Sequence, residues 1–134
     1  MTAKEYLNQA FYLNRQIKAK EKRLEWLREI TPGPSTVFSE EAKVKGKPGN
    51  SAVENAALRV VDLEEEISSD ILHLVELIKE IEAKIRSVDS SEMRTILEMR
   101  YLSFMSWEEI AGRMRYHSNH VFYLHRKALS QIHV

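Results

Sequence analysis

The clearest structural signal lies in residues 106–129, which read SWEEIAGRMRYHSNHVFYLHRKAL. In a helix-turn-helix unit, two short helices cross steeply, so a small residue is needed where they touch and apolar residues are needed on both sides of the turn. Counted from Trp107 as the first position, the positions that must be small or apolar hold Ile110, Ala111, Met114, Tyr116, Val121 and Leu124. All of the requirements are met together, so the sequence predicts a helix-turn-helix here.

Capping signals define the ends of these short helices. Ser106 is followed three residues later by Glu109, which is the spacing of a capping box and predicts a helix from there to about Met114. A second helix is expected from Ser118 to about His133, and an earlier one from Ser90 or Ser91 to about Leu102.

The turn between the two helices departs from the usual pattern. The position often occupied by glycine holds Arg115, so we expect either an unfavourable positive φ there or a slightly longer turn. His117 stands where an N-capping serine would be convenient, and Ser118 is the alternative cap.

Three segments carry a resemblance to a known family. They are RTILEMRYL at 94–102, SWEEIA at 106–111 and VFYLHRKAL at 121–129. Together they resemble region four of the sigma-70 family and, more closely, the ArpU/RinA-like transcriptional regulators of phages and prophages in Gram-positive bacteria. The resemblance covers about residues 92–132 and implies a sigma-region-four-like DNA-binding domain with a role in phage or prophage transcription.

In such a domain the second helix lies in the major groove, with its N-terminal residues nearest the base edges. Asn119 could then pair with adenine, Arg126 could reach guanine or a phosphate, and Phe122 could touch a thymine methyl group. The residues expected to face the bases are His117, Ser118, Asn119, Phe122, Tyr123 and Arg126. The residues expected to bind backbone phosphates are Arg113, Arg115 and Lys127.

Two longer helices are expected in the rest of the chain. Residues 2–30 show three-four apolar spacing with Thr2 and Glu5 as a capping box, and a second helix is expected from near Ser51 to about Arg86. The predicted seam of the first holds Tyr6, Ala10, Leu13, Ile17, Leu24 and Leu27, with Lys20 as its one polar intrusion. The predicted seam of the second holds Val60, Leu63, Ile67, Leu74, Ile78, Ile81 and Ile85, widened by Ile71 and Leu77.

The expected architecture is therefore all-α, with a long antiparallel helical hairpin over residues 1–88 and a helix-turn-helix domain over 89–134. Residues 32–51 contain all three prolines and three of the four glycines, and we expect a flexible loop there. Two long helices alone make a thin core, which favours a homodimer or higher oligomer through them, or packing against the C-terminal part.

Charge is distributed unevenly in this chain of zero net charge. Residues 1–30 carry +3 and residues 52–91 carry −6, which favours pairing of the two long helices. No acidic residue follows Glu109, so the C-terminal end is locally basic and suited to duplex DNA.

Other classes of protein fit the sequence less well. There is no cysteine, no Gly-rich phosphate loop, no nucleophile elbow and no His-Glu-x-x-His motif, so we expect neither an enzyme nor a cofactor. His117, His120 and His125 have poor spacing for a metal site, and His125 is expected to lie toward the core side. No apolar run is long enough to cross a bilayer, and the expected location is the cytoplasm of a bacterial host. The function we expect is that of a DNA-binding regulator, which could also contact RNA polymerase. Two alternatives remain. One is a small-terminase-like packaging protein, and the other is an adaptor that contacts RNA polymerase or another protein without binding DNA.

Overall fold

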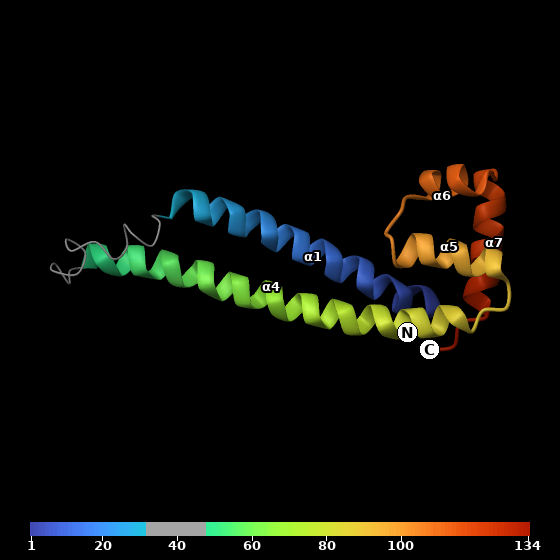
Figure 1. The fold of residues 1–134 in the computed structure, drawn as a ribbon, viewed down its shortest axis with the longest axis horizontal. Coiled ribbons are helices and arrows are strands. Elements are labelled where there is room, and N and C mark those ends of the chain that lie inside the picture. Colours follow the sequence, from blue (N-terminus) through green and yellow to red (C-terminus); the bar gives the residue numbers. More distant parts are fainter. Residues whose placement is uncertain (32–47) are drawn as a thin grey trace. The chain divides into compact units, whose positions relative to one another are not determined.

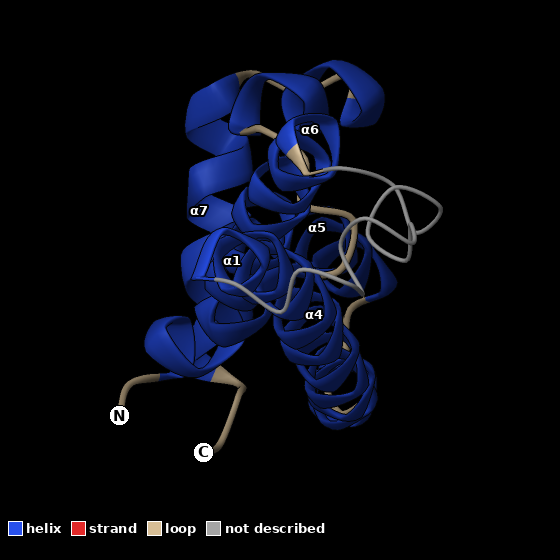
Figure 2. Ribbon diagram, turned by 90° about the vertical axis from the view of Figure 1, so that its left-hand side faces the viewer, coloured by secondary structure: helices blue, strands red, loops and turns tan. Residues whose placement is uncertain are grey.

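A computed structural model describes residues 1–31 and 48–134, and every regular element in those ranges is a helix. The helices are α1 (Ala3–Ile30), α4 (Pro48–Arg86), α5 (Ser91–Tyr101), α6 (Trp107–Met114) and α7 (Ser118–Ser130) (Figure 1). Figure 2 shows these helices joined by loops, with no strand in the part of the chain that is described. The predicted all-α fold class is confirmed.

Two helix ends differ from the prediction. Helix α4 begins at Pro48 rather than near Ser51, so residues 48–51 of the expected loop are helical, and residues 32–47 lie outside the described residues. Helix α7 ends at Ser130, three residues before the expected end. Directly after it, Gln131 is the C-cap, and its Oε1 accepts a hydrogen bond from the backbone N–H of Asp89 at 3.0 Å.

Contacts between residues divide the chain into two units. Unit 1 contains residues 1–14 and 73–134, and unit 2 contains residues 15–72. The predicted domain boundary between residues 88 and 89 lies inside unit 1, at the junction of α4 and α5.

The core of unit 1 gathers side chains from all five helices. Helix α7 packs against both α5 and α6, which also contact each other. The most completely buried large side chains are Leu7, Ile81, Ile85, Val88, Ile96, Leu97, Tyr101, Ile110 and Val121. This core holds the three short helices together and therefore fixes which face of α7 remains exposed.

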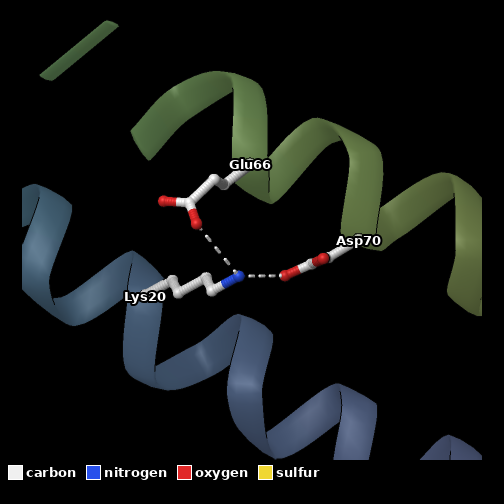
Figure 3. Close-up of polar contacts among 3 residues, drawn as sticks. All are labelled: Lys20, Glu66 and Asp70. Atoms are coloured by element: carbon white, nitrogen blue, oxygen red, sulfur yellow. Dashed lines mark hydrogen bonds and ion pairs between the residues drawn. The ribbon is translucent and has the colours of Figure 1, made fainter. Parts of the chain in front are cut away.

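Unit 2 contains residues 15–30 of α1 and residues 48–72 of α4. Their ion pairs show that the two segments run antiparallel: Arg28 pairs with Glu64 at 3.5 Å, whereas Lys20, earlier in α1, pairs with Asp70 at 2.7 Å. Figure 3 shows the Lys20 ammonium group reaching from α1 to Asp70 and, at 3.8 Å, to Glu66. Lys20, the one polar residue in the predicted seam of α1, thus forms an ion pair with a carboxylate on α4.

The predicted seams are correct at most positions in the two units. Ala10, Ile17, Leu24, Leu63, Ile67, Leu77, Ile81 and Ile85 are buried. Ile71 is the exception, since 42 % of its surface is exposed. Leu7, which the seam omitted, is fully buried because it joins the core of unit 1.

Candidate nucleic-acid interface

The start of α6 is fixed by the predicted capping box. The Ser106 Oγ accepts a hydrogen bond from the backbone N–H of Glu109 at 3.1 Å, and the Glu109 Oε1 accepts one from the backbone N–H of Ser106 at 3.3 Å. Glu108 and Glu109 also place negative charge in the first turn, where it interacts favourably with the helix dipole. The N-terminal end of α6 is therefore defined by local sequence alone.

The turn after α6 is tight and uses a left-handed residue. Arg115 has φ 60° and ψ 40°, so the predicted unfavourable φ is confirmed. Its backbone N–H bonds to the Gly112 carbonyl at 3.3 Å, and the N–H of Tyr116 bonds to the Ala111 carbonyl at 3.1 Å. These two bonds form a Schellman motif, which ends α6 abruptly and turns the chain into α7.

The first residue after the turn caps α7. His117 is the N-cap, and its Nδ1 accepts a hydrogen bond from the backbone N–H of Asn119 at 3.1 Å. Since an accepting nitrogen carries no proton, the proton of the neutral ring lies on Nε2, which can donate outward. Of the two capping residues that the sequence offered, the structure uses His117.

The inner face of α7 is buried against its neighbours. Val121 is 1 % exposed, Leu124 7 % and Ala128 0 %, and on α6 Ile110 and Ala111 are also buried. Met114 and Tyr116 pack against this core and are half-buried. The positions that the helix-turn-helix pattern required to be apolar or small are thus the positions that this packing uses.

A polar contact also lies within this core. The Nε2 of His125 lies 2.6 Å from the hydroxyl of Tyr101 on α5, and the side chain of His125 is buried. The ring of Trp107 stands edge-on against the imidazole, with centroids 4.6 Å apart. His125 therefore faces the core, as predicted, and lies away from any DNA surface.

Burial and nearby positive charge control the ionisation of this pair. Burial, together with the charges of Lys4, Arg100 and Arg126, lowers the pKa of His125 to about 4. Burial raises the pKa of Tyr101 to about 12. At neutral pH both groups are consequently uncharged, which a buried site requires.

A second polar contact attaches the turn to α5. The hydroxyl of Tyr116 donates a hydrogen bond to the carboxylate of Glu92, and this bond raises the pKa of Tyr116. Because Tyr116 lies between α6 and α7, the contact holds the start of α7 at a defined place on α5.

The outer face of α7 is exposed to solvent. It consists of Asn119, Phe122, Tyr123, Arg126 and Lys127, all of which are exposed. Phe122 and Tyr123 expose 36 % and 46 % of their surfaces, so two rings are accessible on this face. Ser118, at the helix start, is half-buried. No acidic side chain follows Glu109, so this face carries donors, rings and positive charge only.

Several of these side chains are ordered by ring contacts. The ammonium group of Lys127 lies 5.3 Å from the centroid of the Tyr123 ring, and the edge of Phe122 meets Trp107 at 5.4 Å. His120, which the sequence left unplaced, is exposed and packs edge-on against Tyr116 at 4.7 Å. The His120 ring is also nearly parallel to that of Tyr123, with the two centroids 6.2 Å apart. Because His120 precedes Tyr123 by three residues in a helix, their spacing was the sequence signal that could have placed His120 beside it.

The remaining predicted cations flank this face along the chain. Arg113, in the last turn of α6, and Arg115, in the turn, are both exposed. In the described part of the chain no ion pair engages either residue or Arg126, so their charges are available to a polyanion.

Within residues 1–31 and 48–134 no group of three or more His, Asp or Glu side chains is arranged to hold a metal ion. No described helix is both long enough and apolar enough to cross a membrane.

The fold and this surface define an all-α protein whose last helix presents one buried and one basic, partly aromatic face. The chain belongs to the family described as protein of unknown function DUF1492, whose model matches residues 35–133. No curated protein and no solved structure matches the chain.

Proposed function

We propose that the protein is a transcriptional regulator that binds specific sequences in duplex DNA, with α7 in the major groove. The observation that carries the proposal is the outer face of α7, which is exposed and free of acidic residues while the opposite face is buried. An α-helix fits the major groove, where each base pair presents a distinct pattern of hydrogen-bonding groups.

The polar residues of the outer face match base edges. The amide of Asn119, in the first turn of α7, can bond in a bidentate manner to N6 and N7 of adenine. Arg126, about two turns later, can bond to O6 and N7 of guanine, and the ring of Phe122 can contact a thymine methyl group. The half-buried Ser118 and the exposed Tyr123 complete the set of base-facing candidates.

The flanking donors are placed to bind the DNA backbone. Arg113, Arg115 and Lys127 are exposed and can each neutralise a phosphate, which positions the protein without reading sequence. His117 is a further base-facing candidate and can donate from Nε2, since its Nδ1 is engaged in the cap. This arrangement predicts affinity that depends strongly on salt concentration.

The resemblance of residues 92–132 to sigma region four and to ArpU/RinA-like regulators supports a role in phage or prophage transcription. Under this proposal RNA polymerase is a second expected partner, and bacterial cytoplasm is the expected location. A packaging protein would share the DNA contact, whereas an adaptor would bind another protein and no DNA.

Titration of a fluorescent duplex pool at several salt concentrations tests this proposal. We expect the affinity to fall steeply with salt, and we expect the double variant Asn119→Ala/Arg126→Ala to bind tenfold or more weakly at a selected site. Lys79→Ala is a matched control, because Lys79 is exposed on α4 in unit 1 and lies outside the proposed surface.

The competing functions give different results in the same titration. An adaptor gives no binding at any salt concentration. If the double variant binds as tightly as the wild type, α7 is not the reading helix.

A further inference from the structure

Unit 2 buries little apolar surface for its length. In its described part, the large apolar side chains that are buried are Ile17, Leu24, Leu63 and Ile67. Its exposed large apolar side chains are more numerous: Trp26, Ile30, Leu58, Val61, Ile71 and Leu72. Two helices that expose this much apolar surface need a further partner to be covered.

One groove is lined by the largest of these side chains, Trp26. It has a volume of about 360 Å³ and is lined from α1 by Arg23, Trp26 and Leu27 and from α4 by Arg59, Asp62, Leu63 and Glu66. Trp26 leaves 58 % of its surface exposed beside the groove.

The apolar border extends beyond the groove along both helices. Ile30 follows Trp26 by one helical turn, and Leu58 precedes Asp62 by one turn, so each lies on the same helix face as its neighbour. Ile30 and Leu58 are each 57 % exposed.

The charges of the groove are balanced. Arg23 and Arg59 supply two positive charges, and Asp62 and Glu66 supply two negative ones. Glu66 lies 3.8 Å from Lys20, whereas in the described part of the chain no ion pair engages Arg23, Arg59 or Asp62.

We propose that this groove is a two-fold symmetric interface that binds a second copy of the chain. In a two-fold interface the same patch meets itself, so its charges must be self-complementary and its apolar residues must pack against their own copies. The two cations and two anions around Trp26 sum to zero, so the arginines of one copy can pair with the carboxylates of the other while the exposed tryptophans pack together. A strongly acidic or strongly basic partner would have no net electrostatic attraction to a groove whose charges sum to zero.

Trp26 is the anchor of this interface. Large aromatic side chains at the centre of an interface carry a disproportionate share of the binding energy, and they lose little conformational entropy on binding. The arginine and carboxylate groups around it then set the register of the two copies.

The interface and the proposed DNA contact use different residues, because the lining of the groove belongs to unit 2 and the outer face of α7 belongs to unit 1. Loss of the dimer and loss of DNA binding can therefore be measured separately, in the absence and presence of DNA.

Sedimentation equilibrium of the full chain over a range of concentrations tests the proposal. We expect a reversible change from the 15.6 kDa monomer to a species of twice that mass. Trp26→Ala should raise the dissociation constant about 30-fold or more. Tyr12→Ala is the matched control, since Tyr12 is a similarly exposed aromatic residue of α1 that lies in unit 1. A monomer at all concentrations, a larger assembly, or a dimer unaffected by Trp26→Ala overturns the proposal.

Charge reversal separates the interface from simple damage to the fold. Arg59→Glu gives the groove an excess of negative charge, and Asp62→Arg gives it an excess of positive charge, so each variant alone should dimerise more weakly. An equimolar mixture of the two should form a heterodimer with affinity near that of the wild type. A mixture that associates no better than either variant alone contradicts the proposed arrangement.

Fluorescence of Trp26 gives a direct reading of its environment. In Trp107→Phe, Trp26 is the remaining tryptophan, and its emission should shift to shorter wavelength as the dimer forms. Emission that is already blue-shifted and does not change with concentration would mean that the chain covers its own groove, and it overturns the proposal.

Discussion

At the scale of single residues, the buried contact between His125 and Tyr101 shows how a polar group is accommodated beneath the exposed face of α7. The imidazole is buried within 2.6 Å of a phenol and beside the ring of Trp107. A buried polar group without a partner costs about 1–3 kcal/mol, so this pair is stable only while both members are present and uncharged.

This ionisation predicts a pH dependence of stability. The pKa of His125 is about 4 in the folded chain and about 6.5 when unfolded, so the unfolded state binds the proton more tightly. Its contribution is therefore complete above pH 6.5 and is lost as the pH falls toward 4. Between pH 7 and pH 4.5, the free energy of unfolding of the wild type should fall about 2 kcal/mol further than that of His125→Gln. Urea denaturation of both proteins measures the difference, and parallel curves would contradict the assignment.

Arg115 combines a strained backbone with an exposed charge. Its φ of 60° is a conformation that glycine adopts at little cost. Arg115→Gly should therefore stabilise the fold by about 1 kcal/mol and, under the proposed function, also weaken DNA binding, because it removes a proposed phosphate contact.

Arg113→Gly is the matched control for this change. It removes the same charge but places glycine inside α6, where it should destabilise the fold by about 1 kcal/mol. Thermal denaturation and a salt titration with DNA give the two readouts. Stabilisation by both variants, or by neither, would contradict the argument.

At the scale of secondary-structure elements, α6 contains a glycine that packing does not require. A Cβ atom built at Gly112 meets no other atom within 4 Å, and the residue is exposed. Gly112→Ala should stabilise the protein by about 1 kcal/mol without changing the affinity for DNA. Denaturation and DNA titration of this one variant check both parts, and a loss of DNA affinity would show that the outer surface of α6 contributes to binding.

The long helices carry an ion pair inside an otherwise apolar seam. The hydrogen bond from Lys20 to Asp70 raises the pKa of the lysine, and both side chains are largely shielded from solvent. Such pairs set the register of paired helices more than they stabilise them.

Removing one partner of the Lys20–Asp70 pair and removing both should therefore have different effects on the melting temperature. Asp70→Leu leaves the Lys20 ammonium group in the seam without its closest carboxylate, so the melting temperature should fall. The double variant Lys20→Leu/Asp70→Leu should melt at least as high as the wild type, because apolar residues then fill the seam. A double variant that melts lower than Asp70→Leu would contradict this expectation.

The same pair shows where sequence reasoning succeeds and where it stops. Three-four spacing identified Lys20 as an intrusion, because spacing depends only on the helix that carries it. Acidic residues of the second helix, Asp70 among them, were expected to pair with the basic first helix, but the particular partner of Lys20 depends on the register of the two helices and could not be assigned from spacing. Ile71 was misplaced for a related reason, since the seam passes through Asp70 and leaves Ile71 exposed.

At the scale of the whole molecule, local signals predicted most of the C-terminal part. The capping box at Ser106, the small residue Ala111 and the apolar positions of α7 each depend only on neighbouring residues in the sequence. The structure forms the capping box and buries Ala111 and those apolar positions, as expected. The contacts of Tyr101 with His125 and of Glu92 with Tyr116 join residues 24 positions apart, and pairings of that kind depend on how the helices pack.

The sequence did not decide how the long helices divide between the two units. The pattern suggested a helical hairpin with its boundary near residue 88, and it left open whether the hairpin associates with another copy or packs against the C-terminal part. In the structure the ends of α1 and α4 share the core of α5, α6 and α7, because Leu7, Ala10 and Ile81 pack into that core. Tertiary packing therefore joins residues that periodicity assigns to different domains.

The central claim is that the outer face of α7 reads sequence in duplex DNA. The most direct test is selection of bound sequences from a random duplex pool at near-physiological salt, with wild-type protein and the Asn119→Ala/Arg126→Ala variant in parallel. We predict that the wild type enriches a defined motif, that a dimer enriches two spaced copies of it, and that the variant loses that preference. No enrichment by the wild type, or the same motif enriched by both proteins, would contradict the claim.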